Sequence, residues 1–369
     1  MYNKVILILI LAVSMVSADV NTAAFLKTSY DATGSALAGA MVSYRNVFSA
    51  TLYNPAAASW SARKTMAGGY SQIFEDSQFN YVSLIVPSRN YAWGLNLIYF
   101  IVKDIDKYSN TGSMLGSDMN NYNASYEMLY SYLYRNKLSL GVKVKSVNEK
   151  LDDYTTSAWA VDTGLQYQLF QKTMLGVSVS NLGQDMGYVE KYSLPKIFRA
   201  GITQYLIYDT IALSVQSNKI VNEDVYNSFA LELFPVDYLT VRMGYKSGDM
   251  VDNISFGIGI TANNISLNYS FTPSDVLGVS HKIDISWEFG QSPKGIEAAI
   301  QKKRREKAQA DQRLQVAQLM LDGDELFKQA RLVEAMAKYA QILTIDKGNR
   351  IAINKIKNTN SILQGVGGE

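Results

Sequence analysis

Apolar and polar residues alternate along most of residues 64–290. A period of two predicts β-strands, because successive side chains of a strand point to opposite faces. The clearest example sets Leu138, Leu140, Val142 and Val144 against Ser139, Gly141, Lys143 and Lys145. We expect fourteen such strands, beginning near residues 64, 77, 90, 122, 138, 158, 173, 196, 210, 227, 238, 254, 265 and 281.

Alternation of this kind fits two architectures. A soluble β-sandwich turns its apolar faces inward, whereas a membrane barrel turns them toward lipid and encloses the polar faces. Here the apolar faces are bulky and unbroken, while the opposite faces mix glycine, serine and charged residues. The alternation alone leaves both architectures open.

The lengths of the connections favour the barrel. One set of predicted turns is tight, for example Arg135 to Lys137 and Asn263–Asn264. The interleaved set is mostly long and polar: Val102 to Asn121, Asn148 to Ser157, Gly183 to Pro195, Asn218 to Asp224, Lys246 to Asn253 and Thr272 to Ser280. Short turns at one end, long loops at the other and an even number of strands are typical of outer-membrane barrels. We therefore predict a mainly β fold, a transmembrane antiparallel β-barrel over residues 64–290.

The first 18 residues have the pattern of an export signal. Lys4 supplies a positive charge, Val5 to Val16 form an apolar run, and Val16-Ser17-Ala18 offers small residues before a cleavage site. The run is short for a membrane span. A cleaved signal peptide is the favoured interpretation, and a retained anchor or a buried helix is the alternative.

Residues 19–63 do not alternate and are rich in small residues. The stretch from Ala36 to Ala58 resembles the N-terminal signature of the PorV/PorQ family, which is itself similar to FadL-type fatty-acid channels. The residues that carry the resemblance are Gly34, Gly39, Asn54, Pro55 and Ala56. The sequence departs from the family pattern in having fewer glycines, at Ala36 and Ala38, and in lacking an acidic pair at Asn46–Val47.

The resemblance implies a fourteen-stranded barrel that holds this N-terminal segment inside as a hatch. It also implies one of two functions. A PorV-like protein would be a scaffold or shuttle for protein secretion or surface attachment, as in type IX secretion, with periplasmic or exported protein partners. A FadL-like protein would instead let hydrophobic small molecules such as long-chain fatty acids pass. Phe25, Leu26, Phe48 and Leu52 are the candidate lining of a hydrophobic pocket in that case.

The period changes from two to that of a helix after Ser292-Pro293-Lys294-Gly295. Residues 291–313 are expected to form a basic helical linker, in which Lys302-Lys303-Arg304-Arg305 is either a solvated face or a contact for anionic lipid headgroups or peptidoglycan. Residues 314–369 resemble a tetratricopeptide (TPR) repeat. The matching positions are Leu319, Gly323, Leu326, Ala335, Tyr339 and Ile342.

The parity of the strands predicts an orientation. If the long loops face outward, strand fourteen ends on the periplasmic side, and the helical domain lies in the periplasm. The strand ends at Trp287-Glu288-Phe289. Trp287 and Phe289 resemble the terminal signal that the outer-membrane insertion machinery recognises, and the alternative is that they are ordinary aromatic residues at the lipid interface.

Charged residues recur on the faces predicted to point inward. They are Glu127, Lys143, Lys145, Asp162, Arg199, Glu232, Arg242, Lys246, Asp284 and Glu288. Because both signs are present, we expect ion pairs across a largely filled interior.

Composition excludes several functions. The formal net charge is +2 and gives no case for nucleic-acid binding, and the absence of cysteine excludes disulfides and thiolate metal sites. Tyrosine outnumbers phenylalanine by 25 to 13, which suits contact with membrane lipids at the interface. The single histidine, His281, has no catalytic partner pattern, and weak calcium binding by Asp152–Asp153 or by Asp104 and Asp106 competes with simple solvation. We expect no enzymatic activity, no cofactor and no metal.

Overall fold

The computed structural model describes residues 22–366, except 46, 75–76, 104–105, 110, 118–120, 208–209, 249–253 and 275–277. The predicted signal peptide, residues 1–18, therefore lies outside the described residues. The chain divides into two compact units, Met1–Pro293 and Lys294–Glu369.

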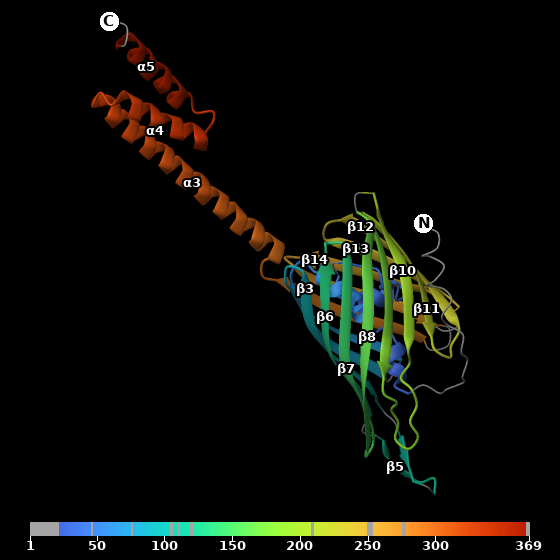
Figure 1. Cartoon of the computed structure of the whole chain (residues 1–369). Coiled ribbons are helices and arrows are strands. Elements are labelled where there is room, and N and C mark those ends of the chain that lie inside the picture. The colour runs from blue at the N-terminus through green and yellow to red at the C-terminus, as the bar shows by residue number, and fades with distance from the viewer. Residues whose placement is uncertain are drawn as a thin grey trace, which may run out of the picture. The chain divides into compact units, whose positions relative to one another are not determined.

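The first unit is a closed antiparallel barrel of fourteen strands (Figure 1). Its strands are β1 (Lys64–Phe74), β2 (Ser77–Pro87), β3 (Tyr91–Val102), β6 (Asn121–Tyr134), β7 (Leu138–Leu151), β8 (Tyr154–Phe170), β9 (Thr173–Gly183), β10 (Ile197–Leu206), β11 (Ile211–Ile220), β12 (Val225–Val236), β13 (Leu239–Ser247), β14 (Ile254–Ala262), β15 (Ile265–Ser274) and β16 (Gly278–Phe289). Strand β1 closes the barrel against β16, in a register that runs from Lys64 opposite Phe289 to Gln72 opposite His281. The short strands β4 (Asp106–Tyr108) and β5 (Met114–Ser117) form a separate two-stranded sheet in the connection from β3 to β6.

The faces of the strands have the sense of a membrane barrel. Val142 and Ile285 point outward and are 40% and 52% exposed, whereas the neighbouring Lys143 and Asp284 are each 1% exposed inside. An apolar outer surface needs lipid around it, because water would leave this large apolar area unburied. The structure confirms the predicted fold class, a fourteen-stranded barrel followed by a small helical region.

The two ends of the barrel differ in their connections. Asn263 and Asn264 join β14 to β15 with φ of 49° and 67°, the left-handed conformations of a type I′ hairpin turn. At the opposite end the predicted long connection Asn148 to Ser157 is wrong, because β7 and β8 continue to Leu151 and Tyr154. A hairpin that extends beyond the lipid can keep its backbone hydrogen bonds while it carries polar side chains on both faces. The length of the strands predicted from hydrophobic alternation is therefore too short there.

The N-terminal segment lies inside the barrel, where Figure 1 shows it in blue. We call residues 22–63 the hatch. It contains η1 (Ala24–Lys27), α1 (Ala32–Ala36), α2 (Ala50–Tyr53) and η2 (Pro55–Trp60). Most of its side chains are buried, which small residues permit because the hatch backbone can then lie close to the wall.

The second unit consists of helices. Helix α3 (Pro293–Lys328) runs through the predicted boundary between linker and repeat at residues 313–314, and α4 (Leu332–Ile345) and α5 (Arg350–Val366) follow. Among the described residues, no helix has both the length and the apolar character that a membrane span requires.

Candidate functional site

Glycines on the inner face of the barrel wall form the surface on which the hatch packs, which we call the seat of the hatch. A Cβ atom added to Gly164 on β8 would lie 1.9 Å from Asn54 Oδ1, and one on Gly141 of β7 would lie 2.2 Å from Ala56 N. A Cβ on Gly176 of β9 would lie 2.1 Å from the Val42 carbonyl oxygen. Such distances are far inside van der Waals contact. The hatch backbone therefore lies directly on the wall, at positions that admit no side chain.

The same contact continues on the opposite part of the wall. A Cβ on Gly244 of β13 would lie 2.4 Å from Ala38 N, and one on Gly257 of β14 would lie 2.4 Å from the Ala36 Cβ. Alternation places these glycines on the inward face, but sequence reasoning did not identify them as contacts of the hatch. The signal that could have found them is the recurrence of glycine at inward positions of several strands.

Hydrogen bonds from wall side chains fix the hatch backbone. Gln166 Nε2 donates to the carbonyl oxygens of Val42 and Tyr44, at 2.9 and 2.8 Å. Gln216 accepts from Val42 N at 2.8 Å through Oε1 and donates to the Gly39 carbonyl oxygen at 3.0 Å through Nε2. These bonds satisfy backbone groups of the stretch between α1 and α2, which forms no helix.

Asn54 connects the hatch to itself and to the wall. Its Oδ1 accepts from Ala56 N at 3.1 Å, which caps η2, and Pro55 occupies the first position of that helix. Its Nδ2 donates to the Val42 carbonyl oxygen at 2.8 Å and to that of Leu165 on β8 at 3.2 Å. Asn54 is fully buried, so all of its polar atoms depend on these partners.

The two predicted hatch glycines serve different needs. A Cβ on Gly34 in α1 would lie 2.3 Å from the Tyr53 hydroxyl oxygen, which in turn donates to Asp31 Oδ1 at 2.8 Å. Gly39 adopts φ of 76°, a conformation that favours glycine. Gly34 thus allows close packing within the hatch, and Gly39 allows the chain to turn.

An aromatic cluster fills the space between the hatch and strands β2 and β3. Phe25 and Phe48 of the hatch belong to it, together with Phe79 and Tyr81 of β2, and Leu26 packs against it. Met186 and Leu194, from the connection between β9 and β10, also belong to it, as do apolar residues of β1, β3, β7 and β8. Leu52, the fourth residue of the predicted hydrophobic pocket, lies in a different cluster, with Leu37, Met41 and Tyr44.

Ion pairs occupy the inner wall, mostly among residues that alternation placed there. Lys143 Nζ lies 3.0 Å from Glu127 Oε2 and 3.7 Å from Asp162 Oδ2, and Lys145 Nζ lies 2.8 Å from Asp162 Oδ1. Lys143 also donates to the Leu52 carbonyl oxygen of the hatch at 3.3 Å. The network therefore joins β6, β7 and β8 to the hatch.

A second set of polar contacts involves three more of the predicted charges. Arg242 Nε lies 2.7 Å from Glu232 Oε1, and Asp284 accepts from Asn268 Nδ2 and from Ala32 N of the hatch, both at 2.8 Å. Glu288 and Arg199 are half-buried.

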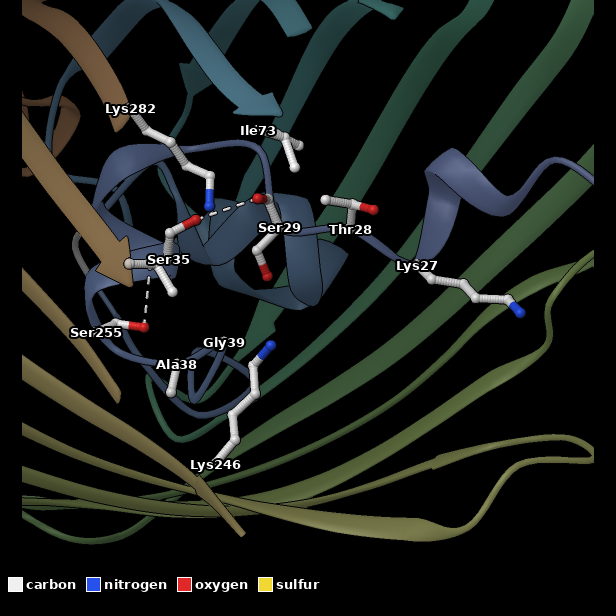
Figure 2. Close-up of a pocket in the computed structure, with 11 residues that line it drawn as sticks. Lys27, Thr28, Ser29, Ser35, Ala38, Gly39, Ile73, Lys246, Ser255 and Lys282 are labelled. Atoms are coloured by element: carbon white, nitrogen blue, oxygen red, sulfur yellow. Dashed lines mark hydrogen bonds between the residues drawn. The ribbon is translucent and has the colours of Figure 1, made fainter. Parts of the chain in front are cut away.

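A cavity of about 180 Å³ lies between the hatch and the wall (Figure 2). Its wall residues Lys246, Ser255 and Lys282 stand near the ends of β13, β14 and β16 that carry the long loops. Its lining comprises Lys27, Thr28, Ser29, Ser35, Ala38, Gly39, Ile73, Lys246, Ser255, Thr272 and Lys282. Of its three lysines, the sequence reasoning named only Lys246. Lys282 was missed although it stands two residues from Asp284, on the same face of β16.

The remaining predicted positions lie apart from the hatch. Trp287 is half exposed on the outer face of β16, with its ring centroid 4.8 Å from that of Phe289. His281 Nδ1 lies 2.7 Å from the Tyr269 hydroxyl. No cluster of three or more His, Asp or Glu side chains suited to a metal ion occurs among the residues that the structure describes.

The helical unit brings the TPR-like positions together. Ala335, Tyr339 and Ile342 of α4 are at most 1% exposed, and Leu319 and Leu326 of α3 pack against them. A Cβ on Gly323 would lie 2.5 Å from the Tyr339 ring, so α3 and α4 approach closely there. The structure places Lys302, Lys303, Arg304 and Arg305 in α3.

Comparison with solved structures identifies the fold. The CymD monoaromatic hydrocarbon channel matches with a TM-score of 0.52 and 12% identity, over 74% of this chain and all of that one. A TodX monoaromatic hydrocarbon channel mutant matches at 0.54 and 12%, over 71% and 99%. A Pseudomonas aeruginosa FadL homologue matches at 0.50 and 10%, over 71% and 99%.

Identities this low show the fold alone, a barrel fold shared with these three proteins. No protein-family model matches the sequence, and neither does any curated protein.

Proposed function

We propose that this protein is a hatch-gated channel of the outer membrane that lets hydrophobic small molecules pass. The observation that carries the proposal is the aromatic cluster between the hatch and β2–β3, to which Met186 and Leu194 of the β9–β10 connection also belong. An apolar molecule entering from the loop end would meet aromatic surface there in place of water. Two of the structurally similar proteins are monoaromatic hydrocarbon channels, which supports this class of cargo.

A reversible lock on the hatch tests the proposal. Ser59 Oγ of the hatch lies 2.7 Å from Ser139 Oγ of β7, so the pair Ser59→Cys and Ser139→Cys is placed to form a disulfide. The chain has no cysteine of its own, so no other disulfide competes. We expect uptake of a labelled long-chain fatty acid or monoaromatic hydrocarbon into cells to fall at least tenfold when the pair is oxidised, and to return on reduction.

The single variant Ser59→Cys is the matched control and should transport under both conditions. Uptake that is unchanged by the lock would contradict gating by the hatch. If the protein raised uptake of neither compound above that of cells lacking it, the channel function itself would be wrong.

The helical unit favours a second candidate, the scaffold role in secretion suggested by the PorV/PorQ resemblance. The observation that favours the scaffold role is the compact helical unit of residues 294–369, because a passive channel does not need such a unit. A periplasmic place for this unit and its contact with exported proteins belong to this proposal. Exported proteins that co-purify with the whole chain, and are lost when residues 294–369 are deleted, would support the scaffold over transport.

A further inference from the structure

The outer wall of the barrel has a hollow at Gly68, where strands β2, β1 and β16 lie side by side. The hollow has a volume of about 270 Å³, and its lining comprises Met66, Ala67, Gly68, Val82, Ile285 and Trp287. Gly68 lies opposite Val82 on β2 and Ile285 on β16, whose side chains point outward and are 45% and 52% exposed. Because Gly68 has no side chain between them, the apolar outer surface is recessed there.

The strand register places two further groups between this hollow and the rim of the barrel. Met66 lies opposite Trp287, and Lys64 lies opposite Phe289, the last residue of β16. Lys64, Met66 and Gly68 alternate onto the same outer face, and Lys64 is four residues, about 14 Å, along the strand from Gly68. Trp287 is half exposed at the level between them. Along β1 the outer surface therefore passes from a cation, past an aromatic ring, to an apolar hollow.

The outer side of the rim at Lys64 is positive. Lys64 is exposed. Arg63 stands next to it and donates from Nη1 to Asn264 Oδ1 at 2.7 Å, a contact with a neutral group that leaves the charge of Arg63 in place. Glu288 lies opposite Thr65 in the register, and alternation turns both of these residues toward the inner face. A negatively charged group that approaches from the lipid therefore meets Lys64, whereas Glu288 lies on the other side of the wall.

We propose that this surface binds one anionic phospholipid, with its phosphate at Lys64 and one acyl chain in the hollow at Gly68. The order of the groups along β1 matches the order of headgroup, interface and hydrocarbon in a membrane leaflet, and tryptophan favours the interface. Lysine near a membrane surface attracts anionic headgroups. An acyl chain that fills the recess gains dispersion contacts with three strands, which a flat wall would not supply. The bound lipid should therefore remain in place while other lipids around the barrel exchange.

Native mass spectrometry of the full chain in a non-ionic detergent tests the site, because it counts bound lipids and measures their affinity. The probe is phosphatidylglycerol, and phosphatidylcholine with the same acyl chains is the reference, because its headgroup has no net charge. We expect the first phosphatidylglycerol to bind at least fivefold more tightly than phosphatidylcholine. Lys64→Met should remove this preference, and Lys64→Arg, which keeps the charge, should retain it.

Lys137→Met is the matched control for charge, because it removes an exposed lysine from the turn between β6 and β7, at the same end of the barrel. Gly68→Leu fills the hollow and should weaken the binding of both lipids at least fivefold. Thr163→Leu is its control, because it enlarges an exposed, outward-facing residue of β8, outside the hollow, and should leave binding unchanged.

Tryptophan fluorescence establishes that each variant is folded, since all four tryptophans lie in the barrel unit. If Gly68→Leu does not fold, Val82→Phe fills the hollow from its side and takes its place. Equal affinity of the unaltered chain for the two lipids, the same loss of preference in Lys137→Met, or unchanged binding to the variant with the filled hollow would overturn the proposal. Each of these results would mean that the wall has only exchanging lipid around it. None of them depends on transport or on secretion.

Discussion

At the scale of single residues, the interior of the barrel is governed by charge pairing. Lys143 is 1% exposed and lies between Glu127 and Asp162, which are themselves buried. A buried pair adds little net stability over an apolar replacement, but removal of one partner leaves the other charge buried and unpaired. The asymmetry makes Lys143 and Lys145 sensitive positions.

We predict that Lys143→Met lowers the free energy of unfolding by about 3–5 kcal/mol, because Glu127 loses its ion-pair partner. Urea unfolding followed by tryptophan fluorescence measures the change. The double variant Lys143→Met with Glu127→Gln should recover a large part of the loss. Equal stability of Lys143→Met and the exposed control Lys137→Met would contradict the ion-pair account.

At the scale of elements, the hatch packs closely against the wall because glycines of the wall have no side chain at the points of contact. Sequence alternation predicted the strands, and the family resemblance separately pointed to Asn54, Pro55 and the hatch glycines. Neither could predict which wall strands touch which hatch residue, because contacts such as Gly164 to Asn54 join positions 110 residues apart. Such contacts depend on how the barrel closes, which no local pattern records.

We predict that Gly164→Ala destabilises the folded barrel by about 1–3 kcal/mol, the usual cost of overpacking, because its Cβ would meet Asn54 Oδ1. Limited proteolysis of the hatch should speed up in parallel. Gly68→Ala is the control, because Gly68 faces outward. A Cβ atom added there would lie no closer than 3.2 Å to any neighbour, the nearest being the Tyr81 carbonyl oxygen. A Gly164→Ala variant as stable and as protease-resistant as Gly68→Ala would refute the proposed seat.

Asp324 of α3 links the three helices of the second unit, through a hydrogen bond to α4 and an ion pair with α5. Asp324 Oδ1 accepts from the Tyr339 hydroxyl at 2.6 Å and pairs with Lys355 of α5. Burial raises the pKa of Asp324, but the hydrogen bonds from Lys355 and Tyr339 outweigh it and hold the pKa below its usual range. Burial, with the bond to Asp324, also raises the pKa of Tyr339 above its usual range.

A carboxyl group with a depressed pKa stabilises the folded state above its unfolded pKa of about 3.9 and loses that effect as the pH falls through its folded value. We therefore predict that the helical unit melts at lower temperature below about pH 4. Circular dichroism at the helix minimum follows this unit in the whole chain. Asp324→Asn should flatten the pH dependence, and an unchanged profile in that variant would assign the effect to other groups.

At the scale of the whole molecule, the sequence predicted the architecture because a membrane barrel repeats one simple rule on every strand. The rule specifies strand number, the outward face and the short turns. The alternation rule fails for segments that do not contact lipid, because their side chains need not alternate. The end of the long β7–β8 hairpin and the small β4–β5 sheet are the examples. The rule also gives no information on the cavity at Lys282, which needs the hatch in place.

Spin labels on single cysteines test most directly whether the apolar face meets lipid, and the cysteine-free chain makes each label unique. Val142→Cys and Ile285→Cys represent the outer face, and Ser131→Cys and Ser270→Cys, both fully buried, represent the inner face. In lipid bilayers we predict strong collisional relaxation by dissolved oxygen at the two outer sites and weak relaxation at the two inner sites. Equal relaxation at all four sites, or the reverse order, would contradict the barrel described here.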